Sequence, residues 1–122
     1  MADRVLALTW GQNVPGREKH GLDVFNEALE YYGSLQADGR IERFDVCIFD
    51  PNGFMAGFML LHGSHEQLDA VREDARFMKL TVDASLVVQD LRLIDGRSGD
   101  GIAETMPLYQ EAIAHAPQEA FA

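Results

Sequence analysis

Histidines are the first candidates for chemistry in this chain, because an imidazole gains or loses a proton near neutral pH. Two of the four, His62 and His65, stand on either side of Ser64. Together with Glu66 they could resemble a metal site, but His62 is predicted to end a strand and His65 to begin a helix. The regular ligand spacing of a single helix is therefore missing. We expect no metal and no cofactor, and we keep His62 and His20 as candidate proton carriers.

An aromatic wall and an amide meet at the end of the first predicted strand. Trp10 shares its side of the strand with Leu8 and Gln12, because successive side chains alternate across a strand. Tyr32 continues the apolar stripe of the first predicted helix, and a buried hydroxyl there needs a hydrogen-bond partner. The predicted ligand-binding residues are Trp10, Gln12, His20, Tyr32 and His62. In the alternative interpretation for Trp10, it is a core residue with a satisfied indole N–H, and in that for His20, it is a solvent-exposed residue.

Asp45 is an unusual carboxylate, because it falls in the middle of a strand among apolar residues. Loss of water around it would raise its pKa and make it a base. Arg43 lies two residues away on the same face of the strand and would lower that pKa again. The alternative is therefore an Asp45–Arg43 ion pair.

The spacing of the apolar residues predicts a strand, a helix, two strands, a helix and a strand, followed by a short helix. The strands are predicted over residues 3–13, 41–50, 54–62 and 85–95, and the helices over residues 17–37, 65–84 and 106–116. Ser64 and Gln67 have capping-box spacing at the start of the second helix, and a bend is expected near Asp74. This order predicts a four-stranded antiparallel sheet with both long helices on one face.

The hairpin formed by the middle strands is apolar on both faces. The turn sequence DPNG predicts a type I turn with a bulge, which pairs Phe44 with Leu60 and Ile48 with Ala56. This register places Met59 and Leu61 on the face away from the helices, beside Phe49. Such an apolar face is larger than soluble monomers usually expose, so a second, identical sheet is expected to cover it.

This arrangement resembles the dimeric α+β barrel superfamily, whose members pair two ferredoxin-like βαββαβ units sheet to sheet. The resemblance covers essentially the whole chain and rests on the element order, the length and the segment RFDVCIFDPNGFMAGFMLL. It implies an α+β fold and a homodimer. Members include cofactor-free monooxygenases, lactone isomerases, haem-degrading enzymes and proteins of unassigned function. No motif in the sequence selects one of these subgroups.

Composition and charge narrow the classes of partner. The length of 122 residues fits one domain over residues 1–122. A formal net charge of -10 repels phosphate backbones and anionic lipids, so we expect neither nucleic acid nor a membrane surface as partner. The sequence begins without the pattern of a signal peptide, which predicts a cytoplasmic protein. Cys47 is the only cysteine, which excludes an internal disulfide and a CxxC site.

Two classes of function remain after these exclusions. The first is a small-molecule-binding protein, in its enzymatic form a cofactor-free monooxygenase- or isomerase-like enzyme. Its pocket would lie between sheet and helices and take a hydrophobic organic molecule with one or two oxygen atoms. The second class is a non-catalytic dimeric structural or regulatory module. A cavity beside Trp10 would favour the first class, and a fully packed interior would favour the second.

Overall fold

The computed structural model describes residues 2–117, and its elements follow the predicted order. The strands are β1 (Arg4–Trp10), β2 (Arg43–Ile48), β3 (Gly57–Gly63) and β4 (Arg92–Arg97). The helices are α1 (Glu18–Ala37), α2 (His65–Arg72), α3 (Ala75–Val87) and α4 (Asp100–His115). The strands form one antiparallel sheet in the order β2-β3-β1-β4. The predicted α+β, ferredoxin-like arrangement is therefore confirmed.

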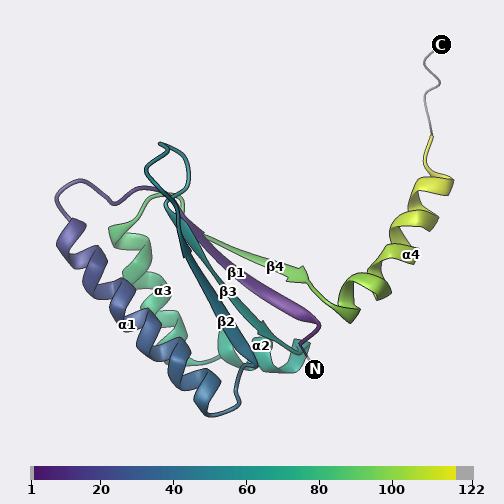
Figure 1. Ribbon diagram of the computed structural model, residues 1–122, viewed down its shortest axis with the longest axis horizontal. Helices are drawn as coiled ribbons and strands as arrows, with labels where there is room; N and C mark the ends of the chain where they lie inside the picture. Colours follow the sequence, from purple (N-terminus) through teal and green to yellow (C-terminus); the bar gives the residue numbers. More distant parts are fainter. Residues whose placement is uncertain (1, 118–122) are drawn as a thin grey trace.

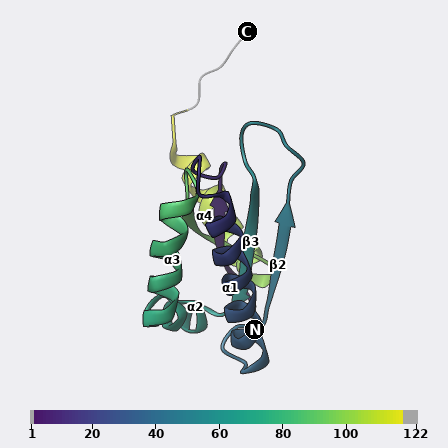
Figure 2. The ribbon, with the colours of Figure 1, turned by 90° about the vertical axis from the view of Figure 1, so that its left-hand side faces the viewer.

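One face of the sheet carries the hydrophobic core. Leu6 and Leu8 of β1 lie beside Leu61 and Met59 of β3, and all four side chains are buried. They pack against the apolar stripes of α1, α2 and α3. Figure 1 shows α1 and α3 on one side of the sheet and α4 leading away from the other side. Figure 2 is seen from the side of α1 and α3, and α4 lies behind these two helices. No helix of residues 2–117 covers the second face of the sheet.

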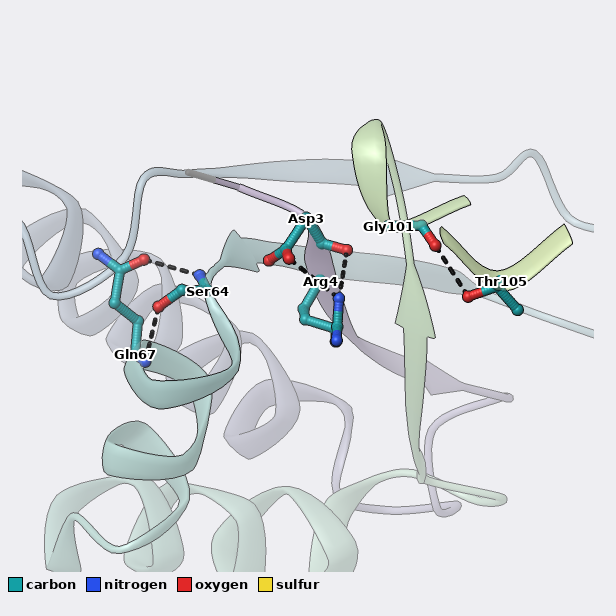
Figure 3. Close-up of polar contacts among 6 residues, drawn as sticks. All are labelled: Asp3, Arg4, Ser64, Gln67, Gly101 and Thr105. Carbon is teal, nitrogen blue, oxygen red and sulfur yellow. Dashed lines mark hydrogen bonds and ion pairs between the residues drawn. The ribbon is translucent and has the colours of Figure 1, made fainter. Parts of the chain in front are cut away.

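The predicted second helix is divided into α2 and α3 by residues 73–74, where a bend near Asp74 was expected. The Asp74 side chain accepts a hydrogen bond from the backbone N–H of Arg76 at 3.0 Å and so caps α3. The capping box at the start of α2 is also confirmed (Figure 3). The Ser64 Oγ accepts from the Gln67 N–H at 3.1 Å, and the Gln67 Oε1 accepts from the Ser64 N–H at 2.8 Å.

The prediction for the last strand was wrong in its first half. Residues 85–87 continue α3, and β4 begins only at Arg92. Leu86 and Val87 begin the Val- and Leu-rich run that predicted a strand, but the apolar stripe of α3 extends through Val87, and packing against the core decides for the helix. The C-terminal helix likewise begins earlier than predicted, at Asp100, and includes Pro107.

The predicted hairpin register was also wrong, by one residue. Phe44 pairs with Leu61, and Ile48 pairs with Gly57. The reason is a longer loop that the Asn52 side chain holds together, because its Oδ1 accepts from the N–H groups of Phe54 and Met55. The shift moves Met59 and Leu61 from the expected uncovered face into the core.

The uncovered face of the sheet, called the open face below, is still mostly apolar with the observed register. Its middle row runs from Ile94 through Ala7 and Leu60 to Asp45. Ile94 is 50% exposed, and the ring of Phe58 lies 5.7 Å from that of Phe49. The residues of the open face are Val5, Ala7, Thr9, Arg43, Asp45, Cys47, Phe49, Phe58, Leu60, His62, Arg92 and Ile94.

Candidate functional site

A cavity of about 280 Å³ lies between the sheet and the helices α1 and α3. Apart from two aromatic donors, an asparagine and a threonine, its walls are carbon atoms of apolar side chains and glycine. Leu8, Trp10, Asn13, Ile48, Ala56, Met59 and Leu91 line it from the strands and loops; Gly21, Leu22, Val24, Phe25, Ala28 and Tyr32 from α1; and Leu80, Thr81, Ala84, Val87 and Val88 from α3 and its end.

The segment after β1 shapes one end of this cavity. Regular strand geometry stops at Trp10, and Asn13 instead forms an isolated bridge with Val88. Both Gln12 and Asn13 are exposed, but only Asn13 of the two lines the cavity. The backbone oxygen of Gln12 accepts a hydrogen bond from the Gln89 N–H at 2.8 Å. Gly21 lies beneath Asn13: a Cβ there would lie only 2.8 Å from the asparagine Oδ1, so the Asn13 side chain would have to shift.

Two neighbouring tyrosines of α1 differ in how their hydroxyls are used. The Tyr31 hydroxyl donates to Asp74 Oδ2 at 2.8 Å. Tyr32 is only 2% exposed, yet its hydroxyl has no hydrogen-bond partner within residues 2–117. Every fully enclosed side-chain nitrogen or oxygen of the described chain does have a partner, so the Tyr32 oxygen must border open space, and Tyr32 lines the cavity.

The protonation state of Tyr32 follows from its burial. Loss of water around the ring, and then the neighbouring Tyr31, raise the pKa of the Tyr32 phenol far above its ordinary value. The phenol is therefore protonated at neutral pH. It acts as a hydrogen-bond donor toward the cavity and not as a base.

Trp10 supplies a second donor. Its ring packs edge-on against Phe25, with the ring centroids 6.2 Å apart. Trp10 is partly buried, and among the described residues no acceptor is found for its indole N–H. Because every fully enclosed side-chain nitrogen of the described chain has a partner, this N–H is accessible. Trp10 and Tyr32 therefore leave two donors without a partner among residues 2–117 in the lining of one apolar cavity.

The structure brings together only two of the five predicted ligand-binding residues, Trp10 and Tyr32. Gln12 and His20 are exposed and do not line the cavity, because the strand ends before Gln12 and His20 lies on the outer side of α1. His62 belongs to the open face, on the other side of the sheet. The missed residues are mainly those of α3, whose helical spacing of Leu80, Ala84 and Val87 the sequence already contains.

His62 belongs instead to a polar group on the open face. Its Nε2 lies 2.8 Å from Asp45 Oδ2, and Arg43 Nη1 lies 2.8 Å from the same oxygen. The hydrogen bond with His62, and then Arg43, hold the pKa of Asp45 below its ordinary value. The Asp45–Arg43 ion pair is confirmed, and the interpretation of Asp45 as a base with a raised pKa is wrong.

A second, more polar cleft of about 480 Å³ lies beside α2. Arg4, Arg72 and Arg97 line it, but Arg4 is paired with Asp3 at 3.1 Å and Arg72 with Asp95 at 2.8 Å. These pairs neutralise much of the positive charge that an anion would need. The apolar cavity is therefore the stronger candidate site.

Within residues 2–117, no three His, Cys, Asp or Glu side chains come together as a metal site would require. Over the same residues, no helix combines the length and apolarity that crossing a membrane demands.

Comparison with known proteins relates the chain to others through its fold. No family model matches the sequence, and no curated protein matches it. A conserved protein from Methanosarcina mazei superposes with a TM-score of 0.61 at 14% identity, covering 80% of this chain and 95% of the other. A dimeric protein of unknown function and ferredoxin-like fold from Bacteroides fragilis gives 0.57 at 14% identity, with 78% and 96% covered.

A third solved structure carries the name of an enzyme. It is a proposed antibiotic biosynthesis monooxygenase from Chloroflexus aurantiacus, with a TM-score of 0.54 at 8% identity, covering 79% of this chain and 93% of the other. At such identities the likeness shows the fold alone. The chain therefore has the ferredoxin-like fold that the sequence predicted.

Proposed function

We propose that this protein binds a mostly apolar organic molecule with one or two oxygen acceptors in the cavity between the sheet and α1 and α3. The observation that carries the proposal is the pair of donors without partners, the Tyr32 hydroxyl and the Trp10 indole N–H, beside walls that are otherwise apolar. An apolar body would fill the cavity, and a carbonyl or ether oxygen would accept from the donors.

The charge of the site and of the chain favours a neutral ligand. Within the described chain, no Lys, Arg or His side chain lines the cavity, so a phosphate or carboxylate would lack a counter-charge. The net charge of -10 adds long-range repulsion of anions. Sugars would leave most of their hydroxyls without partners against these walls.

The residues that line the cavity also limit the chemistry that a bound molecule could undergo. Tyr32 is the only ionisable side chain among the described residues that line the cavity, and it stays protonated. A cofactor-free monooxygenase- or isomerase-like reaction would therefore use Tyr32 as a donor to negative charge that develops on a substrate oxygen. His20 and His62 lie outside the cavity and supply no base, so we propose binding as the primary function.

We further propose a homodimer formed through the open face. The apolar residues of this face, among them the half-exposed Ile94, would be covered by the same face of a second copy. The dimeric state stated for the Bacteroides fragilis protein of the same fold supports this arrangement. A non-catalytic dimeric module remains the alternative if the cavity binds nothing.

A fluorescence titration tests the binding proposal, because Trp10 is the only tryptophan and lines the cavity. We expect 1-tetralone to change the Trp10 emission with saturation, and tetralin, the same hydrocarbon without the carbonyl oxygen, to bind more weakly. Tyr32→Phe removes one donor and should weaken tetralone binding by about 2- to 10-fold, since a hydrogen bond contributes roughly 0.5–1.5 kcal/mol. The same change should leave tetralin binding unaltered. Equal losses for both compounds would contradict the role of the hydroxyl.

A further inference from the structure

α4 is fixed to the sheet at its first turn and at no later point in the described chain. The backbone N–H of Ser98 donates to the Asp3 carbonyl at 3.1 Å. Gly101 is buried against the same carbonyl, so closely that a Cβ would collide with it. Thr105 then donates to the Gly101 carbonyl at 2.8 Å, one turn further along (Figure 3). These contacts set the direction in which α4 leaves the sheet.

Beyond this anchor α4 exposes an apolar stripe. Ile102, Met106, Tyr109 and Ile113 follow the spacing i, i+4, i+7 and i+11, which places them on one side of the helix. Their exposed fractions are between 44% and 60%. The acidic residues Glu104 and Glu111 lie on the opposite side. This is the pattern of a helix that packs against another surface, yet within residues 2–117 no such surface covers Ile102, Met106 or Tyr109.

The stability of α4 requires such a surface. A lone helix of 16 residues is marginal in water, and Pro107 within it removes a hydrogen bond and adds about 3 kcal/mol of cost. The first-turn anchor does not compensate for the later turns, where every residue from 106 to 115 is exposed.

The position of α4 relative to the open face suggests which surface could cover its apolar stripe. α4 leads away on the side of the open face, opposite to α1 and α3, in both views (Figures 1 and 2). A second copy seated on the open face would therefore lie beside α4. At about 1.5 Å per residue α4 is about 24 Å long, close to the roughly 20 Å of a six-residue strand.

The area of the open face gives the same answer. Four strands spaced about 4.8 Å apart and about 20 Å long present a face on the order of 400 Å². Each partner of a standard interface contributes roughly 800 Å². The sheet alone is thus small for a stable dimer, and the stripe of α4 supplies further apolar area.

We propose that α4 is a docking arm whose apolar stripe packs against a second copy of this chain, so that two arms embrace the dimer. The inference rests on the homodimer proposed above. It assigns to Ile102, Met106 and Tyr109 a role in assembly, and it explains why the first turn of α4 is held by a glycine contact.

The test compares two variants of the full chain. Met106→Asp places a charge in the stripe, whereas Leu108→Asp, 65% exposed and on another side of α4, changes charge and helix propensity in the same way. Sedimentation equilibrium should show a dimer dissociation constant raised about tenfold or more by Met106→Asp and changed less than about threefold by Leu108→Asp. Far-ultraviolet circular dichroism should show helix loss when the wild-type dimer is diluted to monomers.

The outcomes separate the arm from the dimer itself. If the wild-type chain dimerises and Ile94→Asp in the open face dissociates it, but Met106→Asp dimerises as the wild type does, the arm is refuted and the sheet dimer stands. Equal effects of Met106→Asp and Leu108→Asp would also refute the arm. A wild-type chain that is monomeric at micromolar concentration would refute both.

Discussion

Ile94→Asp is expected to convert the protein from a dimer to a monomer, with a dissociation constant raised by about 100-fold or more. Ile94 lies on the open face beside Ala7, so a carboxylate there would lose its water in the dimer, even with Arg92 two residues away on the same face. A 100-fold change corresponds to about 2.7 kcal/mol, which is within the range for burying a polar or charged group at an interface. In the monomer the side chain is 50% exposed and should tolerate the change.

Val82→Asp provides the matched control for this prediction. Val82 is also 50% exposed, but it lies on α3, on the other side of the molecule from the open face. The Val82→Asp variant adds the same charge as Ile94→Asp to a chain whose formal net charge is already -10. It therefore reports any effect of net charge alone on the dimer. Light scattering and sedimentation measure both variants. A dimeric Ile94→Asp chain, or a Val82→Asp chain that dissociates as readily, would contradict the assigned interface.

Ala84→Phe is expected to abolish binding of 1-tetralone, with affinity reduced by about 100-fold or more. Ala84 lines the cavity from α3, and a phenyl ring there would occupy much of its 280 Å³. Trp10 emission and isothermal titration calorimetry measure the loss. The milder Ala28→Leu, which fills the cavity from α1, should weaken binding less, and it serves if the larger side chain disturbs packing.

The control for the filled cavity is Ala70→Phe, at an exposed position of α2 that does not line the cavity. It should bind tetralone as the wild type does. Circular dichroism and the melting temperature show whether each variant is folded. A folded Ala84→Phe chain that still binds tetralone with wild-type affinity would place the binding site elsewhere.

The order of the helices and strands could be predicted from the sequence because each long element has its own spacing of apolar residues and its own cap or turn residues. α1 shows a wide helical stripe, and the capping box at Ser64 and the N-cap at Asp74 are short-range signals. Tertiary packing determined the boundary between α3 and β4. Leu86 and Val87 begin an apolar run that predicts a strand, but Val87 completes the core-facing stripe of α3, which no local preference reveals.

Short-range sequence patterns predicted the β2–β3 register and the residues of the cavity only in part. The DPNG turn predicted one pairing, but hydrogen bonds of the Asn52 side chain lengthen the loop and exchange the faces of Met59 and Leu60. Trp10 and Tyr32 were found because both follow an apolar stripe. Gln12 was chosen over Asn13 because the end of β1 was placed too late, so alternation was extended past Trp10.

The central claim is that a mostly apolar molecule with an oxygen acceptor lies between the sheet and α1 and α3. Nuclear Overhauser contacts between bound 1-tetralone and methyl groups of the wild-type protein test it most directly. The account predicts contacts to the methyls of Leu8, Val24 and Val87, which surround the cavity. Contacts to Leu60 and Ile94 of the open face instead, or no contacts at a tetralone concentration that saturates the Trp10 emission, would contradict it.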